Sequence, residues 1–268
     1  MEYFICDMAA TGADAEFYLN EIPLTRLVHD VAEREAMPVN HFLIHGENRL
    51  GILIKPGSTP AKALSEARTE KPRAPIRVNA RLSAYPPGAI PGEDPGRDLA
   101  VVEEAIPDDR ELRFPLYVET RFNYATRFGR WAWQTAPRLT LDDRLRTTVH
   151  GLLTQLTASL QRADPALFLR LASLRFEENA VAFEEDAPSR RQKWADGLRQ
   201  LSQKPNWTFA QPALETMSLR LCADSRLLDC KATDWIPIIR ARQNEHGVYL
   251  VRYPMFLANI SGQLQIVR

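Results

Sequence analysis

The side chains best suited to recognition gather in one aromatic and arginine-rich stretch between residues 121 and 133, which reads RFNYATRFGRWAW. Trp, Tyr and Arg are the residue types most enriched at the energetic centres of protein interfaces, and aromatic rings also stack on sugars and bases. We therefore predict a binding surface in this stretch. Its candidate residues are Arg121, Tyr124, Arg127, Arg130, Trp131 and Trp133. The alternative is a hinge between two domains, with the two tryptophans packed inside it.

A second candidate surface is acidic. Glu184, Glu185 and Asp186 follow one another shortly after the pair Glu177 and Glu178. Paired carboxylates serve as acid and base in glycoside hydrolysis when they flank a bond. These acids, however, come at the end of an expected helix and in the loop after it, which favours a solvated edge. Glu184, Glu185 and Asp186 are also predicted to form a recognition surface for a basic partner.

A third candidate surface surrounds Trp235, in the run Asp-Trp-Ile-Pro. Arg240 and Arg252 lie on expected neighbouring strands of the same half. Together these side chains are predicted to bind a partner or an anionic ligand from an exposed sheet face. The alternative is that they are ordinary rim residues of the sheet.

No metal site is predicted. His41 and His45 are four residues apart within NHFLIHGEN, a spacing that brings two ligands together on a helix. This segment is expected to be a strand, where positions i and i+4 lie about 13 Å apart. We interpret both as sheet or turn histidines.

The sequence also lacks the common catalytic and cofactor motifs. It has no Gly-x-Ser-x-Gly, no Walker A and no GxGxxG. Cys6, Cys222 and Cys230 fall in expected strands, where a buried thiol is usually inert. We predict no catalytic residue and no cofactor, and we leave enzyme activity open while favouring its absence.

Composition bounds the protein class. The 268 residues carry 34 basic and 34 acidic side chains, so no basic excess points to nucleic acid. No apolar run is long enough to insert in a membrane. Three cysteines without a repeated spacing suggest reduced thiols and a cytoplasmic protein, with a removed leader peptide as the alternative. The preference for Arg over Lys is typical of a GC-rich bacterial genome.

The first part of the chain is expected to be all β. Gly46-Glu47-Asn48 is predicted to turn a hairpin, since Gly and Asn tolerate positive φ. IRVNARLSAY, residues 76–85, alternates apolar and polar residues as a half-buried strand does. Residues 57–75 and 86–98 are predicted loops, with one helical turn at 61–68. The predicted strands are 3–6, 16–19, 24–28, 40–44, 49–54, 76–85 and 113–120.

The last part is expected to be helices followed by hairpins, which implies an α+β domain. We predict one helix capped by Thr140, a second that starts at Asp164-Pro165 and runs to Phe176 or beyond, and a third capped by Ser189. The predicted strands are 217–222, 227–231, 236–240, 247–253, 255–259 and 263–267. A tight turn would pair Cys222 with Leu227, so no disulfide to Cys230 is expected.

The predicted organisation is therefore a β-sandwich domain at 1–120, an aromatic and Arg-rich connector at 121–138, and an α+β domain at 139–268. Residues 17–57, with their Leu-Asn-Glu-Ile-Pro-Leu start and Leu-Ile-His-Gly-Glu-Asn-Arg-Leu-Gly-Ile-Leu-Ile end, resemble jelly-roll modules of the galactose-binding-like kind. The C-terminal half is similar in element order to NTF2-like and cystatin-like layouts. These resemblances concern the scaffold.

We expect a non-catalytic protein that binds another protein, such as an immunity or adaptor protein of a bacterial toxin or secretion system. One alternative is a carbohydrate-binding or carbohydrate-active module, which the jelly-roll resemblance and the aromatic stretch favour. Another is an enzyme with a pocket in the α+β domain. The candidate residues for such a pocket are Asp229, Asp234, His246, Tyr249 and Tyr253.

Overall fold

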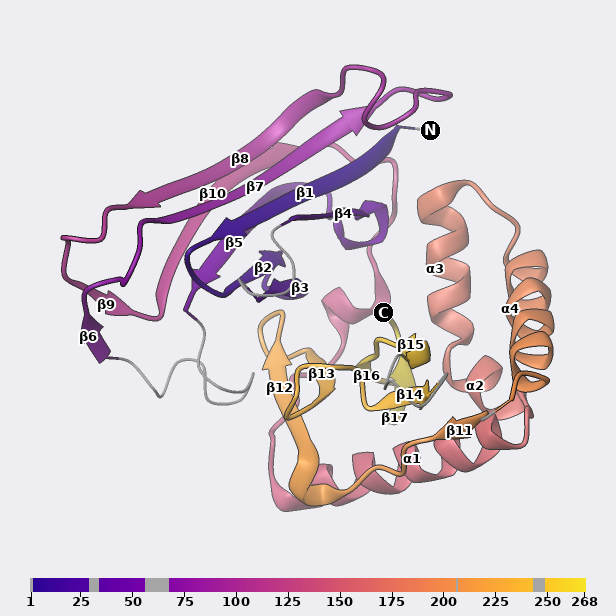
Figure 1. The fold of residues 1–268 in the computed structure, drawn as a ribbon. Helices are drawn as coiled ribbons and strands as arrows, with labels where there is room; N and C mark the ends of the chain where they lie inside the picture. The colour runs from indigo at the N-terminus through magenta and orange to yellow at the C-terminus, as the bar shows by residue number, and fades with distance from the viewer. Residues whose placement is uncertain (1, 29–33, 56–67, 206, 243–248) are drawn as a thin grey trace. The chain divides into compact units, whose positions relative to one another are not determined.

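The structure is a computed structural model that describes residues 2–28, 34–55, 68–205, 207–242 and 249–268 (Figure 1). The chain forms two compact units, Met1–Arg130 and Trp131–Arg268. Across the described ranges, antiparallel sheets and four α-helices confirm the predicted mixture of β and α+β structure. No helix in those ranges is long and apolar enough to cross a membrane.

The first unit is a β-sandwich of two four-stranded antiparallel sheets. One has the order β4-β1-β7-β8, and the other has the order β10-β5-β2-β3. A short ribbon of two further strands, β6 and β9, completes the unit. The strands are β1 (Tyr3–Thr11), β2 (Ala15–Leu19), β3 (Ile22–Leu27), β4 (Arg34–Pro38), β5 (Gly46–Ile54), β6 (Arg68–Glu70), β7 (Ile76–Tyr85), β8 (Arg97–Ile106), β9 (Leu112–Phe114) and β10 (Leu116–Tyr124).

Alternating burial builds the core of this unit. Every second residue of β1 is buried, from Phe4 to Ala10, and β7 follows the same rule from Ile76 to Leu82. The two strands pair along their whole length and lie side by side in Figure 1. This is the pattern expected of strands with one face in the core, and it confirms the strand predicted from IRVNARLSAY.

The strand predicted at 40–44 is wrong. Residues Asn40–Phe42 form a 3-10 helix, η1, and Gly46 to Asn48 belong to β5 instead of a hairpin turn. Two asparagines explain the difference, because their side chains take over backbone hydrogen bonds. Asn40 Oδ1 accepts from Phe4 N at 2.9 Å, and Asn48 Oδ1 accepts from Ile44 N at 2.9 Å.

Other differences also concern the strands of this unit, among them β4, which was not predicted. The strand predicted at 113–120 is β9 and β10, separated by Pro115, which cannot donate a ladder hydrogen bond. Strand β8 was missed, and it begins inside the loop predicted at 86–98. The predicted helical turn at 61–68 lies outside the described residues up to 67, and Arg68 begins β6.

In its described residues, the second unit contains four α-helices and two antiparallel sheets, with the orders β11-β14-β15 and β12-β13-β16-β17. The helices are α1 (Asp143–Gln161), α2 (Ala166–Leu171), α3 (Ser173–Phe183) and α4 (Ala187–Ser202), and the 3-10 helices are η3 (Ala132–Thr135) and η4 (Leu214–Thr216). The strands are β11 (Thr208–Phe209), β12 (Met217–Cys222), β13 (Leu227–Ala232), β14 (Ile239–Arg242), β15 (Tyr249–Tyr253), β16 (Phe256–Ile260) and β17 (Gln263–Ile266).

The core of the second unit joins helices to sheets. Val149, Leu153, Leu156 and Leu160 of α1 are fully buried at spacings of three and four, in one apolar cluster with residues of β12 and β13. The register pairs Cys222 with Leu227 and Cys230 with Leu219, and all three cysteines are buried. This agrees with the prediction of no disulfide.

The helix caps differ from those predicted. The N-cap of α1 is Asp142, not Thr140, and its carboxylate accepts from Leu145 N at 2.7 Å. The N-cap of α4 is Asp186, whose carboxylate accepts from Ser189 N at 2.8 Å. Carboxylates and hydroxyls both cap helices well, so the choice depends on which side chain reaches the third amide. The second predicted helix also divides at Ala172 into α2 and α3.

Candidate functional site

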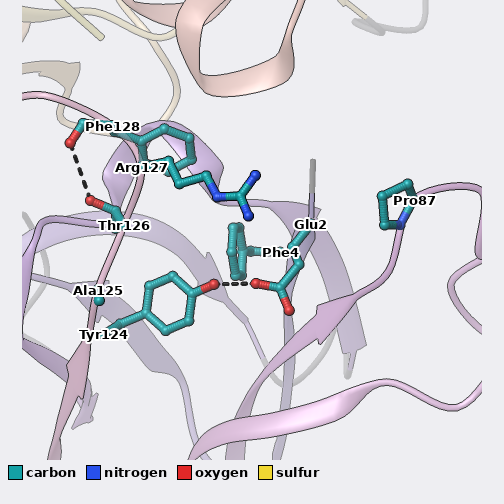
Figure 2. Close-up of a pocket in the computed structure, with 8 residues that line it drawn as sticks. All are labelled: Glu2, Phe4, Pro87, Tyr124, Ala125, Thr126, Arg127 and Phe128. Carbon is teal, nitrogen blue, oxygen red and sulfur yellow. Dashed lines mark hydrogen bonds between the residues drawn. The ribbon is translucent and has the colours of Figure 1, made fainter.

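A pocket of about 350 Å³ in the first unit is lined in part by residues of the predicted aromatic stretch (Figure 2). One wall is the end of β10 and the four residues that follow it. The opposite side comes from the start of β1 and from the loop between β7 and β8. The lining residues are Glu2, Phe4, Pro87, Tyr124, Ala125, Thr126, Arg127 and Phe128.

The base of the pocket is aromatic and rigid. Phe4 points inward from β1, is buried, and meets the Tyr124 ring edge to face at 5.2 Å between centroids. The backbone amide of Phe4 is held by Asn40, as described above. The pocket wall is fixed from the other side, where the ring Nδ1 of His45 lies 3.3 Å from the carbonyl oxygen of Thr126.

The polar centre of the pocket is the pair Tyr124 and Glu2, drawn as a dashed line in Figure 2. The Tyr124 hydroxyl donates to the Glu2 carboxylate, whose other oxygen lies 3.3 Å from Arg97 Nη2. Burial raises the pKa of Tyr124 to about 12, with further contributions from the hydrogen bond and the charge of Glu2. Tyr124 therefore stays protonated at neutral pH and acts as a donor.

The cationic part of the pocket is Arg127. Its side chain is exposed, and Figure 2 shows its guanidinium reaching over Phe4 toward the space beside Glu2. Within the described residues, no ion pair or hydrogen bond of the Arg127 side chain is found. Arg130, three residues on, is also exposed and has no such contact there. Two exposed arginines are thus available to bind an acidic group.

The structure brings Tyr124 and Arg127 together in this pocket, but it does not place Arg121 there. Arg121 lies within β10, 3.2 Å from Glu119 and 3.6 Å from Glu47. The predicted connector at 121–138 therefore includes the end of a strand as well as the helical turn η3. The units divide after Arg130.

The remaining two members of the aromatic stretch are buried in the second unit. Trp131 and Trp133 expose 2% and 5% of their surface. The Trp131 ring lies 5.0 Å from the guanidinium carbon of Arg268. Neither ring offers an open face for stacking.

The predicted acidic surface joins α3 to α4. Glu184 ends α3 in a left-handed conformation with φ 51°, Glu185 pairs with Arg190 at 2.5 Å, and Asp186 caps α4. Asp186 and Glu185 thus have structural partners within the unit. Glu184 and Asp186 are exposed, as a recognition surface requires.

The third predicted surface, around Trp235, includes two cations that were not predicted. Trp235 has φ 66°, and two cations lie near its ring, Arg220 at 5.8 Å and Lys231 at 5.7 Å from the ring centroid. Both cations also approach the buried carboxylate of Asp229, at 3.3 Å and 3.6 Å. Arg240 and Arg252 lie over the Tyr249 ring instead.

Among the described residues, a cavity of about 320 Å³ in the second unit is lined by Asp143, Arg146, Thr147, Leu214, Met217 and Leu219, none of which was proposed for an enzyme pocket. Asp234 pairs with Arg240 at 2.8 Å, and Tyr253 packs against Trp194. His246 lies outside the described residues.

The described ranges contain no arrangement of side chains suited to metal binding or thiol chemistry. No group of three His, Cys, Asp or Glu side chains there is placed to hold a metal ion. Burial raises the pKa of Cys6 to about 12 and that of Cys230 well above its ordinary value. Both thiols therefore stay protonated at neutral pH.

Sequence reasoning missed Glu2 and Phe4, because nothing in the chain links residue 2 to residue 124. It also missed Arg268 and Glu178, which form a buried ion pair. No protein-family model, curated protein or solved structure matches this chain.

Proposed function

We propose that this chain is a non-catalytic protein that binds another protein through the pocket beside Tyr124. The finer assignment is an adaptor or immunity protein of a bacterial toxin or secretion system. The observation that carries the proposal is Arg127. It reaches into an aromatic-based pocket with no carboxylate partner among the described residues, and Arg130 stands exposed nearby.

The chemistry of the pocket favours an acidic side chain of the partner. Glu2 is the single carboxylate in the lining, and it already accepts from Tyr124 and lies beside Arg97. Arg97 and Arg127 both act on Tyr124 through their charges, so two cations face one carboxylate here. A volume of about 350 Å³ is at the small end for ligand sites and suits one inserted side chain.

The ionisable groups of this region support binding over catalysis. Tyr124 is a neutral donor at physiological pH because its pKa is raised to about 12. The Thr126 hydroxyl donates to the Phe128 carbonyl at 3.4 Å. The partner of the Thr126 hydroxyl is a carbonyl, which does not act as a base, and the Tyr124 hydroxyl keeps its proton at neutral pH although it donates to the Glu2 carboxylate.

The test compares charge-reversed variants in affinity purification from the native organism. We expect wild type to retain one stoichiometric partner that the double variant Arg127→Glu, Arg130→Glu loses. Arg110→Glu is the matched control, since Arg110 is also an exposed arginine of the first unit. With the purified partner, calorimetry should show an affinity loss of at least about tenfold for the double variant and less than about twofold for the control.

Two results would contradict this proposal. One is a partner that binds the double variant as tightly as wild type. The other is an affinity that does not fall as salt is raised, because attraction between the arginines and an acidic group is screened by salt.

One observation favours the carbohydrate-binding alternative, and it concerns Tyr117 of β10, which does not line the pocket. Tyr117 of β10 is 43% exposed, and its ring lies against the sheet over Gly51. An aromatic ring held in this way offers a stacking surface. A glycan array with wild type and Tyr117→Ala tests the idea, and binding that survives the substitution would reject it.

A further inference from the structure

Strand β10 is an open edge of the first unit. It stands at the end of its sheet and pairs with β5 along one side, from Leu116 opposite Ile54 to Tyr124 opposite Gly46. Among the described residues, no backbone hydrogen bond joins its other side to another segment. Glu119 is an exposed residue although only 25% of its side chain is exposed, so its backbone contributes to the exposed surface. The edge therefore presents backbone donors and acceptors to solvent.

The other ends of the two four-stranded sheets carry features that hinder a further strand. β3 contains Pro23, which cannot donate a ladder hydrogen bond, and β4 ends in Pro38. The pairing of β7 with β8 has a register shift at Leu82 and Ser83, and such bulges twist an edge away from a flat partner. By contrast, β10 has nine residues, no proline and an unbroken register. It is therefore the end best suited to pair with another strand.

The core-facing side of β10 is covered only in part. Every second residue of the strand, from Leu116 to Tyr124, is half-buried, and none is fully buried. The cross-strand neighbour of Val118 is Ile52, which has no exposed surface. Val118 and Phe122 thus leave apolar surface at the rim of the sandwich. Another strand beside β10 would cover that surface and gain the free energy of burying it.

The sequence of β10, LYVETRFNY, is complementary in charge to its own reverse. When two copies pair antiparallel about a two-fold axis at Thr120, Glu119 of each copy faces Arg121 of the other, so the ion pair forms twice. In the same pairing Val118 faces Phe122 of the second copy on the core side. Opposite charges and apolar side chains that face each other across strands both stabilise a sheet.

The charges also select this register over its neighbours. A pairing centred one residue earlier places Glu119 opposite Glu119 of the second copy. A pairing centred one residue later places Arg121 opposite Arg121 of the second copy. Like charges directly opposite each other destabilise a sheet, so only the pairing about Thr120 avoids this repulsion among the three.

We propose that β10 is a homodimer interface, in which the strands of two copies pair antiparallel about Thr120 and join their four-stranded sheets into one. The occupant of the edge is a second copy of this chain, because the charge and apolar patterns of the strand fit that strand itself. This inference goes beyond the proposed function. The pocket depends on Arg127 and Arg130, which lie outside β10, so separate variants test the two assignments.

The experiment measures the mass of the full chain by sedimentation at concentrations of about 1 to 500 μM. Wild type should shift from the mass of one chain toward that of two as the concentration rises. Glu119→Arg and Arg121→Glu each place like charges opposite one another twice, so each should weaken dimerisation at least about tenfold. Glu111→Arg is the matched control, because Glu111 is an exposed carboxylate of the same unit outside β10, and it should dimerise as wild type does.

An equimolar mixture of the two single variants tests the register directly. In a mixed dimer, both cross-strand pairs are again opposite in charge. The mixture should therefore dimerise within about threefold of the wild-type affinity, although neither variant dimerises well alone. A variant that merely misfolds cannot be rescued in this way. The double variant Arg127→Glu, Arg130→Glu should also dimerise normally, which separates this interface from the pocket.

Hydrogen exchange of wild type covers the case in which the single variants do not fold. The outward amides of β10 should exchange more slowly in concentrated than in dilute protein, because pairing gives them acceptors. Four results would each overturn the proposal. These are a wild type with the mass of one chain at every concentration, single variants that dimerise as tightly as wild type, a mixture of folded variants that stays monomeric, and exchange in β10 that does not depend on concentration.

Discussion

The Tyr117 ring lies across Gly51 in the sheet of β10 and β5. A Cβ added to Gly51 would come within 2.2 Å of the Tyr117 hydroxyl oxygen. Tyr18, on the next strand, meets the same ring edge to face at 6.2 Å. The missing side chain of Gly51 thus creates the space in which an otherwise exposed tyrosine packs against the sheet.

We predict that Gly51→Ala moves Tyr117 off the sheet. Overpacking of this kind destabilises by about 1 kcal/mol when the displaced side chain can swing into solvent. Burial is the main cause that raises the pKa of Tyr117 to about 12, so displacement should lower that pKa toward its ordinary value. Denaturant unfolding and spectrophotometric titration of the tyrosines measure the two effects. In a Tyr117→Ala background, Gly51→Ala should be neutral, and an equal loss of stability in both backgrounds would refute the packing argument.

Tyr124 should make stability fall at alkaline pH. Its pKa in the fold, about 12, lies above the ordinary value of about 10, so folding favours the protonated hydroxyl. This contribution is fully present below about pH 10 and is lost as pH rises toward 12. Tyr124→Phe should therefore flatten the decrease in unfolding temperature between pH 10 and pH 12. Tyr253→Phe is a useful comparison, since burial alone raises the pKa of Tyr253 to about 12. Unchanged slopes in Tyr124→Phe would show that the pKa of Tyr124 is not raised in the folded protein.

The three thiols should be unreactive in the folded protein. Cys6, Cys222 and Cys230 are buried, and burial keeps Cys6 and Cys230 protonated at neutral pH. A disulfide reagent added to native protein should therefore modify them slowly, and all three should react at once in denaturant. Fast modification of one native thiol would point instead to an activated cysteine and would reopen the enzyme hypothesis.

Asp186 should contribute to the stability of α4 as its N-cap, and Ser189 should contribute less. The hydrogen bonds from Ser189 lower the pKa of Asp186 below its ordinary value. A lowered pKa means that this contribution is present above the unfolded value of about 4 and is lost as pH falls through the folded value. We expect Asp186→Ala to lower the unfolding temperature at pH 7, and to lower it progressively less as the pH falls below about 4. Ser189→Ala keeps the backbone amide that donates to Asp186, so a larger loss in Ser189→Ala would contradict this assignment.

Local patterns predicted much of the fold but not its details. The alternation in residues 76–85 and the apolar stripe of α1 follow from the periods of strand and helix, which the sequence carries by itself. Residues 40–48 misled the prediction, because Asn40 bonds to β1 and Asn48 bonds to the loop before β5. The Asn40 contact depends on a strand 36 residues away, which the local sequence does not contain.

The sequence by itself determined the mixture of β and α+β structure, with its helices and most strands, and it named Tyr124 and Arg127 as candidate binding residues. Only the tertiary structure decided that these two share a pocket with Glu2 and Phe4, whereas Trp131 and Trp133 are buried. Likewise, the ion pair of Glu178 with Arg268 joins residues that are 90 positions apart. Short-range periodicity fixes which face of an element is apolar, but the pairing of distant elements depends on sheet register and packing, which no short stretch of sequence encodes.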